Sequence, residues 1–385
     1  MDYDVIIVGG GPAGSSAAIR LASSGLNTLL LEEKSMPRDK LCGEFITPES
    51  FPSLRRLGVL DSMMSAGAQR ITSVNLVAPN GESFKKRISD LSEVSSVAMS
   101  LSRARFDQIL FEKARESGAT CLEGIAVRNV ILEDNRPRGV EALSLKEGKT
   151  LSFHAGLVVD ASGRNSRLTL TPDERIGGRP GSRLYGLKAH LRSVDEIEDQ
   201  VELYFFPGGY GGLSRVEDGK VNLCFIASEE AFKASRGDPE KIAERTIMRN
   251  RLASERLRRS EIAGPWLSTG PLTFGVRRLA RNGIITAGDS SGMIDPFTGT
   301  GIQMALRAGE LAAGAIISAI GSAPDPVGQA AALYRARHEE EFGRRMIVAG
   351  LLRRVAFSPA ISNALSIFLA RTPWLARMLL RATRA

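Results

Sequence analysis

Three glycines near the N-terminus have the spacing of a phosphate-binding turn. Gly9, Gly11 and Gly14 follow an apolar run at residues 5–8 that predicts a buried strand, and they lead into a helix expected over residues 15–24. The first glycine permits the tight turn, the second lets a pyrophosphate approach the backbone, and the third allows close packing of helix on strand. The free N–H groups at the helix start would then face the anion.

A carboxylate completes this unit. Residues 28–31 predict a second strand, and Glu32 stands at its end, 18 residues after Gly14. There a carboxylate can accept hydrogen bonds from both hydroxyls of a ribose, so the whole pattern predicts a bound dinucleotide. The negative charge disfavours a 2′-phosphate, and we therefore do not expect NADP as the resident ligand.

A second strand followed by polar residues lies far along the chain. Residues 283–287 predict a buried strand that ends in Gly288 and Asp289, whose carboxylate could hold ribityl hydroxyls. A helix expected from Ile302 would direct its positive end at a ligand beside Gly301. This arrangement suits a reduced flavin, which carries negative charge near its N1 and O2 atoms.

A third segment repeats the pattern in the middle of the chain. Residues 157–159 predict a strand, and the polar turn after it begins with Asp160. For Asp160 we favour a place in a pyrophosphate loop over a role as proton carrier.

Together these three segments resemble the FAD-dependent oxidoreductases of the p-hydroxybenzoate hydroxylase superfamily, which includes aromatic hydroxylases, geranylgeranyl reductases and flavin-dependent halogenases. The likeness runs from residue 1 to about residue 345. Residues 38–44, Arg-Asp-Lys-Leu-Cys-Gly-Glu, resemble the Cys-Gly-Glu segment of geranylgeranyl reductases, which lies over the flavin in those proteins. The Trp-x-Trp-x-Ile-Pro segment typical of halogenases has no counterpart, because the only tryptophans are Trp266 and Trp374.

The resemblance assigns roles to individual residues. It implies Arg103 near the pyrophosphate and ribityl chain, with Arg105 as the less favoured anchor, and it places adenine against the backbone of Val127. The flavin-facing catalytic residues would be Cys42, Gly43 and Glu44, although Cys42 could instead be a small buried apolar residue. The motifs and the resemblance together predict these FAD-binding residues: Gly9, Gly11, Pro12, Ala13, Gly14, Glu32, Glu33, Lys40, Arg103, Val127, Asp160, Gly288, Asp289, Pro296, Gly299, Gly301 and Ile302.

We expect no catalytic or metal-binding role for the remaining lysine and histidine candidates. Lys188 could point at a substrate cavity, but an exposed strand lysine is the favoured interpretation. His154, His190 and His338 lack metal-ligand spacing, and we expect no metal site. A second glycine turn is absent from the sequence, so NAD(P)H would dock transiently as the electron donor, with a separate donor as the alternative.

The net charge of +8 sits at one end of the chain. Residues 344–385 contain eight arginines and no acid, and the remaining 43 basic residues equal the 43 acidic ones. The body is therefore not a general polyanion binder, and we expect no nucleic-acid partner. The arginine-rich tail fits either a helix on an anionic membrane surface or a helix pair packed on the body, and the sequence favours neither.

Compartment follows from composition. Three cysteines favour a reducing environment, no apolar run is long enough to span a bilayer, and acids replace the positive region of a secretory signal at the N-terminus. We expect a cytoplasmic protein, with peripheral contact to the inner face of the membrane if the tail is the membrane-surface helix and not the helix pair packed on the body.

The expected fold class is α/β: a Rossmann-like βαβ FAD-binding domain of the glutathione-reductase type, interrupted by a mixed β-sheet substrate domain and followed by C-terminal helices. The FAD-binding domain would comprise residues 1–70, 100–180 and 275–325, the substrate domain 71–99 and 181–274, and the basic helical tail 326–385. Within this plan, residues 182–270 are expected to be mostly strand and turn.

The resemblance favours reduction of a carbon–carbon double bond in a lipophilic, isoprenoid- or polyketide-like small molecule. The alternatives are an NAD(P)H-dependent flavin monooxygenase that hydroxylates or epoxidises, and a non-catalytic flavoprotein.

Overall fold

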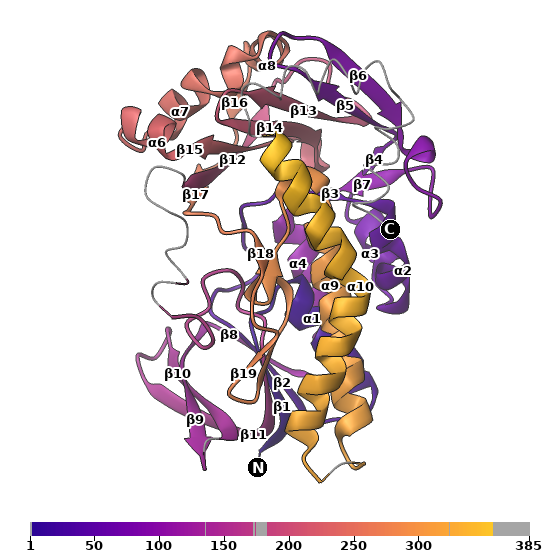
Figure 1. Cartoon of the computed structure of the whole chain (residues 1–385), viewed down its shortest axis with the longest axis vertical. Coiled ribbons are helices and arrows are strands. Elements are labelled where there is room, and N and C mark those ends of the chain that lie inside the picture. The colour runs from indigo at the N-terminus through magenta and orange to yellow at the C-terminus, as the bar shows by residue number, and fades with distance from the viewer. Residues whose placement is uncertain (1, 135, 172–173, 175–182, 323, 357–385) are drawn as a thin grey trace.

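Two β-sheets stand one above the other in the computed structural model (Figure 1), which describes residues 2–134, 136–171, 174, 183–322 and 324–356. The first sheet is the lower one in that view, and the second sheet is the upper one. The longest helix, α10 (Pro326–Ala356), runs along the molecule in front of the lower part.

The first sheet has a parallel centre. Its strands lie in the order β19-β20-β11-β1-β2-β8, and β9 and β10 extend it as a hairpin on β11. The bounds are β1 (Tyr3–Val8), β2 (Thr28–Glu32), β8 (Thr120–Glu123), β9 (Ile125–Glu133), β10 (Arg136–Ser144), β11 (Thr150–Asp160), β19 (Ala280–Arg281) and β20 (Ile284–Thr286).

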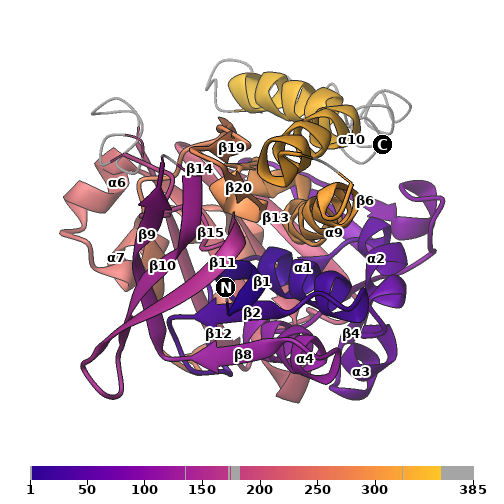
Figure 2. The same ribbon diagram turned by 90° about the horizontal axis from the view of Figure 1, so that it is seen from below.

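Both faces of the first sheet are covered, which explains its continuous apolar runs. Val5 and Ile7 pack with the helices α1 (Pro12–Ser23), α4 (Arg103–Glu116) and α9 (Gly301–Ala319). Ile6 and Val8 point the other way, into a cluster with residues of β9 and β10. Figure 2 shows the helices on one side of the sheet and the β9–β10 hairpin on the other.

The register brings the predicted polar turns together. Val8 at the end of β1 pairs with Leu31 of β2 and with Asp160 of β11, and Asp160 pairs in turn with Thr286 of β20. Four parallel strands therefore end at one edge, so Glu32 and the turns after Val8, Asp160 and Thr286 lie side by side. The expected fold class is confirmed in this domain.

The second sheet is predominantly antiparallel and has the order β16-β12-β15-β14-β13-β5-β6, with β17 beside β12. The bounds are β5 (Ser73–Val77), β6 (Ser83–Arg87), β12 (Leu184–Arg192), β13 (Gln200–Phe206), β14 (Gly209–Arg215), β15 (Val221–Ser228), β16 (Glu261–Ile262) and β17 (Leu267–Thr269). Its members come from two stretches of chain that the first sheet's strands separate, so the second domain interrupts the first.

Residues 183–270 are mostly strand and turn, as expected, but they also contain three short helices that the sequence analysis did not single out. They are α6 (Glu229–Ala234), α7 (Pro239–Arg245) and α8 (Arg251–Leu257). Each begins at a residue whose side chain accepts a backbone N–H: Ser228, Asp238 and Asn250. The helices cover the outer face of the second sheet, where Ile242 and Leu257 join Tyr204 and Phe225 in one core.

Smaller elements connect the two sheets. A three-stranded sheet of order β3-β7-β4 joins β3 (Phe45–Ile46), β7 (Ala98–Ser100) and β4 (Gln69–Ile71), so residues 98–99 pair outside the second sheet, unlike the expected boundary at 99. The remaining elements are α2 (Phe51–Arg56), α3 (Leu60–Ser65), and the paired strands β18 (Gly275–Val276) and β21 (Gly292–Met293).

The C-terminal boundary also needs correction. Tyr334, Phe342 and Ala349 of α10 are buried in the same core as α1 and α9, so this part of the expected tail belongs to the body. The expectations for residues 357–385, including membrane contact, fall outside the residues that the structure describes. Among the helices it does describe, none is long and apolar enough to cross a membrane.

The contact between α1 and α9 leaves no room for a side chain at Gly309. A Cβ there would lie 2.2 Å from the Ala13 carbonyl oxygen, which belongs to backbone and cannot move aside easily. We predict that Gly309→Ala lowers the free energy of unfolding by about 1–3 kcal/mol in urea denaturation. The control is Gly314→Ala on the same helix, where a Cβ would meet only the flexible end of Arg337; it should be neutral or stabilising. Equal stability of the two variants would contradict the prediction.

Candidate functional site

The glycine turn is built by backbone packed on backbone. Gly9 has φ +106°, and a Cβ on it would lie 2.4 Å from the Ala161 carbonyl oxygen. A Cβ on Gly14 would lie 1.9 Å from the Gly9 carbonyl oxygen. Both positions therefore require glycine, and the turn after β11 supports the turn after β1.

Two carboxylates and two arginines lie directly behind this turn. Glu32 Oε2 accepts from Gly10 N at 2.8 Å and from Arg38 Nη2 at 3.1 Å. Asp107 accepts from Arg38 Nη1 at 2.6 Å and from Arg103 Nε and Nη2, both at 2.8 Å. The side chains of Glu32, Arg38 and Asp107 are buried. We call these four residues, Glu32, Arg38, Arg103 and Asp107, the ionic cluster.

The ionic cluster keeps its acids ionised. Burial raises the pKa of Glu32, but the charge and hydrogen bond of Arg38 outweigh it and leave the pKa lowered. Burial likewise raises the pKa of Asp107, and the two arginines more than reverse it. The guanidinium groups consequently remain paired and oriented.

The structure separates the roles of the two arginines of α4. The terminal nitrogen Nη2 of Arg103 lies 4.0 Å from the place a Cβ would take on Gly11, and that of Arg38 lies 3.9 Å from it. Arg105 points elsewhere, to the Ala66 carbonyl and the Asp218 carboxylate. Arg103 is thus the arginine at the glycine turn, and Arg38 is a second one that the sequence analysis did not single out.

The segment after β20 reaches the same place from the other side. Gly288 has φ +65°, and a Cβ on it would lie 2.9 Å from the Ala13 Cβ of α1. The next residue, Asp289, is exposed. Its carboxylate interacts electrostatically with four cations: Arg103, Arg164, Lys40 and Arg277. The N-termini of α1 and α9 therefore open on a region where four cations lie near one carboxylate.

Asp160 is the last residue of β11, at the start of the turn that follows this strand. Its carboxylate is fully buried and accepts from its own turn: Ser162 N (3.1 Å), Ser162 Oγ (2.6 Å), Ser166 Oγ (2.5 Å) and Thr169 Oγ1 (2.5 Å). These donors occupy the carboxylate, so its role in this structure is to shape the turn that supports Gly9, and the expected place of Asp160 in a pyrophosphate loop stays a prediction. Strand-end acids look alike in sequence, and only the fold shows which one faces inward.

The other predicted FAD-binding residues surround the same edge of the sheet. Pro12, Ala13 and Ile302 are buried in helix starts, Glu33 and Lys40 are exposed, and Val127 is half-buried on β9. Pro296 lies in the turn before α9, and Gly299 there has φ +71°. Around Gly301 no heavy atom of the described chain lies within 4 Å of where a Cβ would be.

Cys42, Gly43 and Glu44 lie between the two sheets, and their exposure differs sharply. Gly43 is exposed and Cys42 half-buried, whereas Glu44 is completely buried with φ +57°. Glu44 Oε1 accepts from Lys188 Nζ at 2.5 Å, and Oε2 lies 2.7 Å from His190 Nε2. Lys188 is only 1% exposed, so the expectation of an exposed strand lysine is wrong.

Lys188 and His190 were detectable in principle. They lie two residues apart on β12 and so share one face of the second sheet, but their acidic partner lies 144 residues earlier than Lys188. Asp107, four residues after Arg103, carried a similar helical signal.

Among the described residues, three side chains lie close enough together to be considered as metal ligands. Asp39, Glu44 and His190 have ligand atoms within 4.8 Å of one another. Lys188 Nζ lies between the two acids, at 2.5 Å from Glu44 and 3.7 Å from Asp39. An ammonium group thus already supplies the positive charge that a metal ion would bring.

The second sheet presents an apolar face to the first domain. Residues that pair across neighbouring strands point to the same face of a sheet. The pairing therefore puts one cross-strand row on the side where Lys188 meets Glu44, and this row consists of Lys188, Cys224, Gly212, Leu203 and Leu76. Half-buried residues of this row and the next form what we call the apolar face: Leu76, Leu203, Phe205, Gly212 and Cys224. Residues on the opposite side, such as Tyr204 and Phe225, are fully buried.

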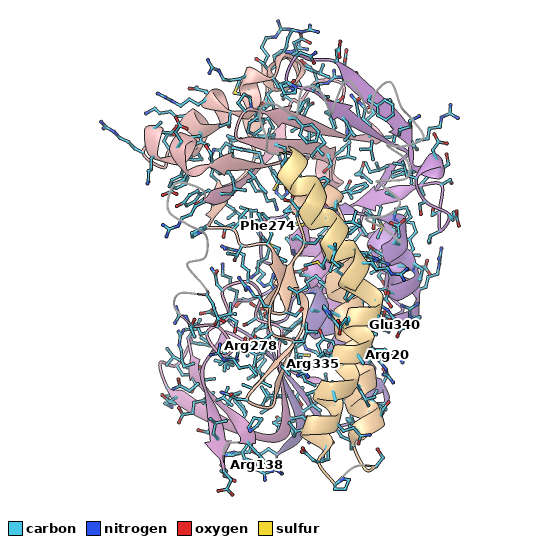
Figure 3. The ribbon with its side chains drawn as sticks, in the orientation of Figure 1. Arg20, Arg138, Phe274, Arg278, Arg335 and Glu340 are labelled. Atoms are coloured by element: carbon cyan, nitrogen blue, oxygen red, sulfur yellow. The ribbon has the colours of Figure 1, made fainter. Side chains whose placement is uncertain are left out.

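Aromatic side chains close one end of the apolar face. Tyr210 donates its hydroxyl to Asp295 Oδ1 at 2.5 Å and packs in a cluster with Phe274 and Phe297. Figure 3 shows Phe274 at the level where the upper and lower parts of the molecule meet. The second sheet is therefore joined to the segment that leads into α9.

The residues present fit FAD. Two oriented guanidinium groups and an uncapped helix start stand beside Gly11, where a pyrophosphate can approach the backbone. Glu32 retains lone pairs for a ribose, and Asp289 and the start of α9 stand ready for the flavin end. Residues 38–44 lie against the side of the second sheet that carries the apolar face.

Comparisons with known proteins identify the family of this chain. A family model described as FAD binding domain matches residues 2–326, and the chain belongs to that family. It is an FAD-dependent enzyme, and the resemblance to FAD-dependent oxidoreductases is confirmed.

Similar curated proteins fall into two groups. Digeranylgeranylglycerophospholipid reductase 2 of Methanopyrus kandleri is 29% identical over 89% of this chain and 84% of its own length. Digeranylgeranylglycerophospholipid reductase 1 of Methanococcoides burtonii is 30% identical over 82% of this chain and 75% of its own. The 1H-pyrrole-2-carbonyl-(peptidyl-carrier protein) chlorinase of Pseudomonas fluorescens is 25% identical over 83% and 76%.

Solved structures share the fold. A geranylgeranyl bacteriochlorophyll reductase-like protein from Thermoplasma acidophilum has a TM-score of 0.79 at 22% identity, covering 92% of this chain and 88% of that one. The myxobacterial chondrochloren halogenase has a TM-score of 0.78 at 24% identity, covering 90% and 82%.

Asp107 is the residue on which both arginines of the ionic cluster depend. Asp107→Asn would leave two buried guanidinium groups short of negative charge, and we predict a loss of about 3–5 kcal/mol in the free energy of unfolding together with weaker FAD binding. Calorimetry of the FAD-free protein and titration with FAD measure the two effects. Glu112→Gln, on an exposed part of α4, is the control. Unchanged FAD affinity in Asp107→Asn would contradict the role of the ionic cluster.

His338 gives the stability a defined pH dependence. It lies between the rings of Tyr334 and Phe342, where burial lowers its pKa to about 4 from 6.5. The folded protein then binds fewer protons than the unfolded chain between these values, so stability falls from pH 6.5 to 4, by roughly 3 kcal/mol. We predict that His338→Leu removes this slope in urea denaturation, whereas His154→Leu at an exposed site keeps it. An identical slope in both variants would contradict the assignment.

Proposed function

We propose that this chain is an FAD-dependent reductase that saturates a carbon–carbon double bond in a lipophilic, isoprenoid-like molecule. The single observation that carries the proposal is the apolar face of the second sheet. Its residues are half-buried although they face another domain, so a lipophilic molecule can bury them further. The names of the reductase relatives support the same substrate class.

The chain's own residues would orient the two reactants. FAD, when bound, supplies the hydride chemistry. The start of α9 at Gly301 stabilises negative charge with its free N–H groups, and the ionic cluster holds the pyrophosphate end. The apolar face excludes water from the substrate, and Phe205 and Tyr210 bound it at one end.

The electron donor is part of the proposal. NAD(P)H is proposed to dock transiently, because the sequence has a single glycine turn of the dinucleotide-binding type and FAD takes it. Reduction by a separate donor protein is the alternative, and the experiment below uses a chemical reductant so that its result does not depend on the donor.

The experiment is anaerobic turnover. FAD-loaded protein is reduced with dithionite under argon and mixed with a geranylgeranyl lipid, and the products are analysed by mass spectrometry. We predict products heavier by two hydrogens for each double bond reduced, without oxygen. Turnover that requires oxygen and inserts it into the substrate would overturn the reductase assignment in favour of a monooxygenase, and reduced flavin that no lipid reoxidises would indicate a non-catalytic flavoprotein.

A matched pair of variants tests the apolar face in the same assay. Leu203→Arg places a charge on the face and should lower kcat/KM by about tenfold or more, since burying an unpaired charge is costly. Leu145→Arg introduces the same change at a residue that is 49% exposed in the first domain, and it should leave turnover unchanged.

A further inference from the structure

Residues 38–44 cross the inner side of the second sheet and are held there by its side chains. We call them the crossing segment. Donors from three different strands reach its backbone carbonyls: Lys188 Nζ of β12 to Lys40 O (3.1 Å), Asn222 Nδ2 of β15 to Cys42 O (3.0 Å) and Ser214 Oγ of β14 to Gly43 O (3.2 Å). Asn222 and Ser214 are 1% exposed, so solvent does not compete for these bonds.

The carboxylate of Glu44 closes the crossing segment at its end. Besides Lys188 and His190, it accepts a hydrogen bond from Arg103 N, at 2.7 Å from Oε1. One side chain thus connects the crossing segment to β12 and to the start of α4, next to the ionic cluster. The backbone of Glu44 has φ +57°, a left-handed conformation that few residues other than glycine adopt. This conformation is strained, so the contacts of the Glu44 side chain have to stabilise it.

The conformation of Glu44 also sets that of Cys42. Glu44 N donates to Cys42 Sγ at 3.3 Å, so the thiol is oriented by the residue that Lys188 and His190 hold. A buried carboxylate must be paired to stay ionised, and here burial raises the pKa of Glu44 while His190 and Lys188 lower it by more. The charged and titratable groups around Glu44 and Cys42 include Lys188 and His190 on β12, Asp39 in the crossing segment and Cys224 on β15. Arg103 on α4 also interacts with Cys42 through its charge and its side chain.

We propose that Lys188 and His190 are positioning residues, which act through the carboxylate of Glu44 to fix the crossing segment and the Cys42 thiol beside the flavin. The second sheet that carries the substrate's apolar face would thereby control the geometry of the residues nearest the cofactor. The inference rests on the flavin-facing place of the crossing segment. It holds for either reaction considered above.

Hydrogen exchange of the FAD-loaded full-length protein, read by mass spectrometry on peptides covering residues 38–46, tests the proposal. Lys188→Met removes the cation and should speed exchange in these peptides by about tenfold, the effect of losing one hydrogen bond to a charged group. Lys85→Met on the exposed strand β6 is the control and should leave exchange unchanged. His190→Ala, at a half-buried site, is the milder variant if Lys188→Met does not fold.

The double variant distinguishes charge pairing from packing. Adding Glu44→Gln to Lys188→Met removes the unpaired buried carboxylate, so exchange should return to within about threefold of the parent protein. The absorption spectrum of the bound FAD should shift in Lys188→Met and should return to that of the parent protein in the double variant. Exchange in Lys188→Met equal to that of the control, or a double variant as open as Lys188→Met alone, would overturn the proposal. Neither readout requires turnover, so a failure here is distinct from a failure of the proposed reaction.

Discussion

The first domain depends on a place where backbone packs on backbone with no side chain between. Gly14 lies against the Gly9 carbonyl, and Gly9 lies against the Ala161 carbonyl. A side chain at either glycine would separate β1, β11 and the start of α1. The same closeness leaves the N–H groups at the helix start open to a phosphate, so the requirement for packing and the requirement for binding are met by the same residues.

Charge is arranged around this turn in pairs that burial makes strong. The acids of the ionic cluster are ionised because two guanidinium groups neutralise them, and the guanidinium groups are oriented because the acids hold them. Asp160 shows the contrasting case. It faces hydroxyl and amide donors of its own turn, and its charge therefore organises loop structure without contacting the region beside Gly11.

The two domains meet through polar contacts at one end and aromatic contacts at the other. At the polar end Glu44 collects donors from β12 and α4, and at the aromatic end Tyr210 bonds to Asp295 before α9. Between these ends lies the apolar face, whose residues are half-buried. The strands that carry it, β14 and β15, also hold the crossing segment, so the proposed substrate surface and the residues proposed to lie beside the cofactor share the same strands.

Local patterns in the sequence were sufficient to predict the βαβ unit and the class of ligand. These follow from local chemistry: Gly9, Gly11 and Gly14 have no close substitute in such a turn, and apolar strands covered on both faces read as continuous runs. Helices α6, α7 and α8 were missed although Ser228, Asp238 and Asn250 are ordinary helix caps, because short amphipathic helices on a sheet resemble turns in sequence.

The pairing of the buried charges became visible only in the folded chain. The sequence favoured an exposed lysine at position 188, but the structure places β12 beside residues 38–44 and buries that side chain. Nothing in the sequence indicates that the carboxylate of Asp160 is enclosed by its own turn. Burial and ion pairing depend on neighbours brought from more than a hundred residues away, as with Lys188 and Glu44. The spacing of residues along the chain does not reveal such distant neighbours. They are set by the pairing register of the strands, which determines the face on which each side chain lies.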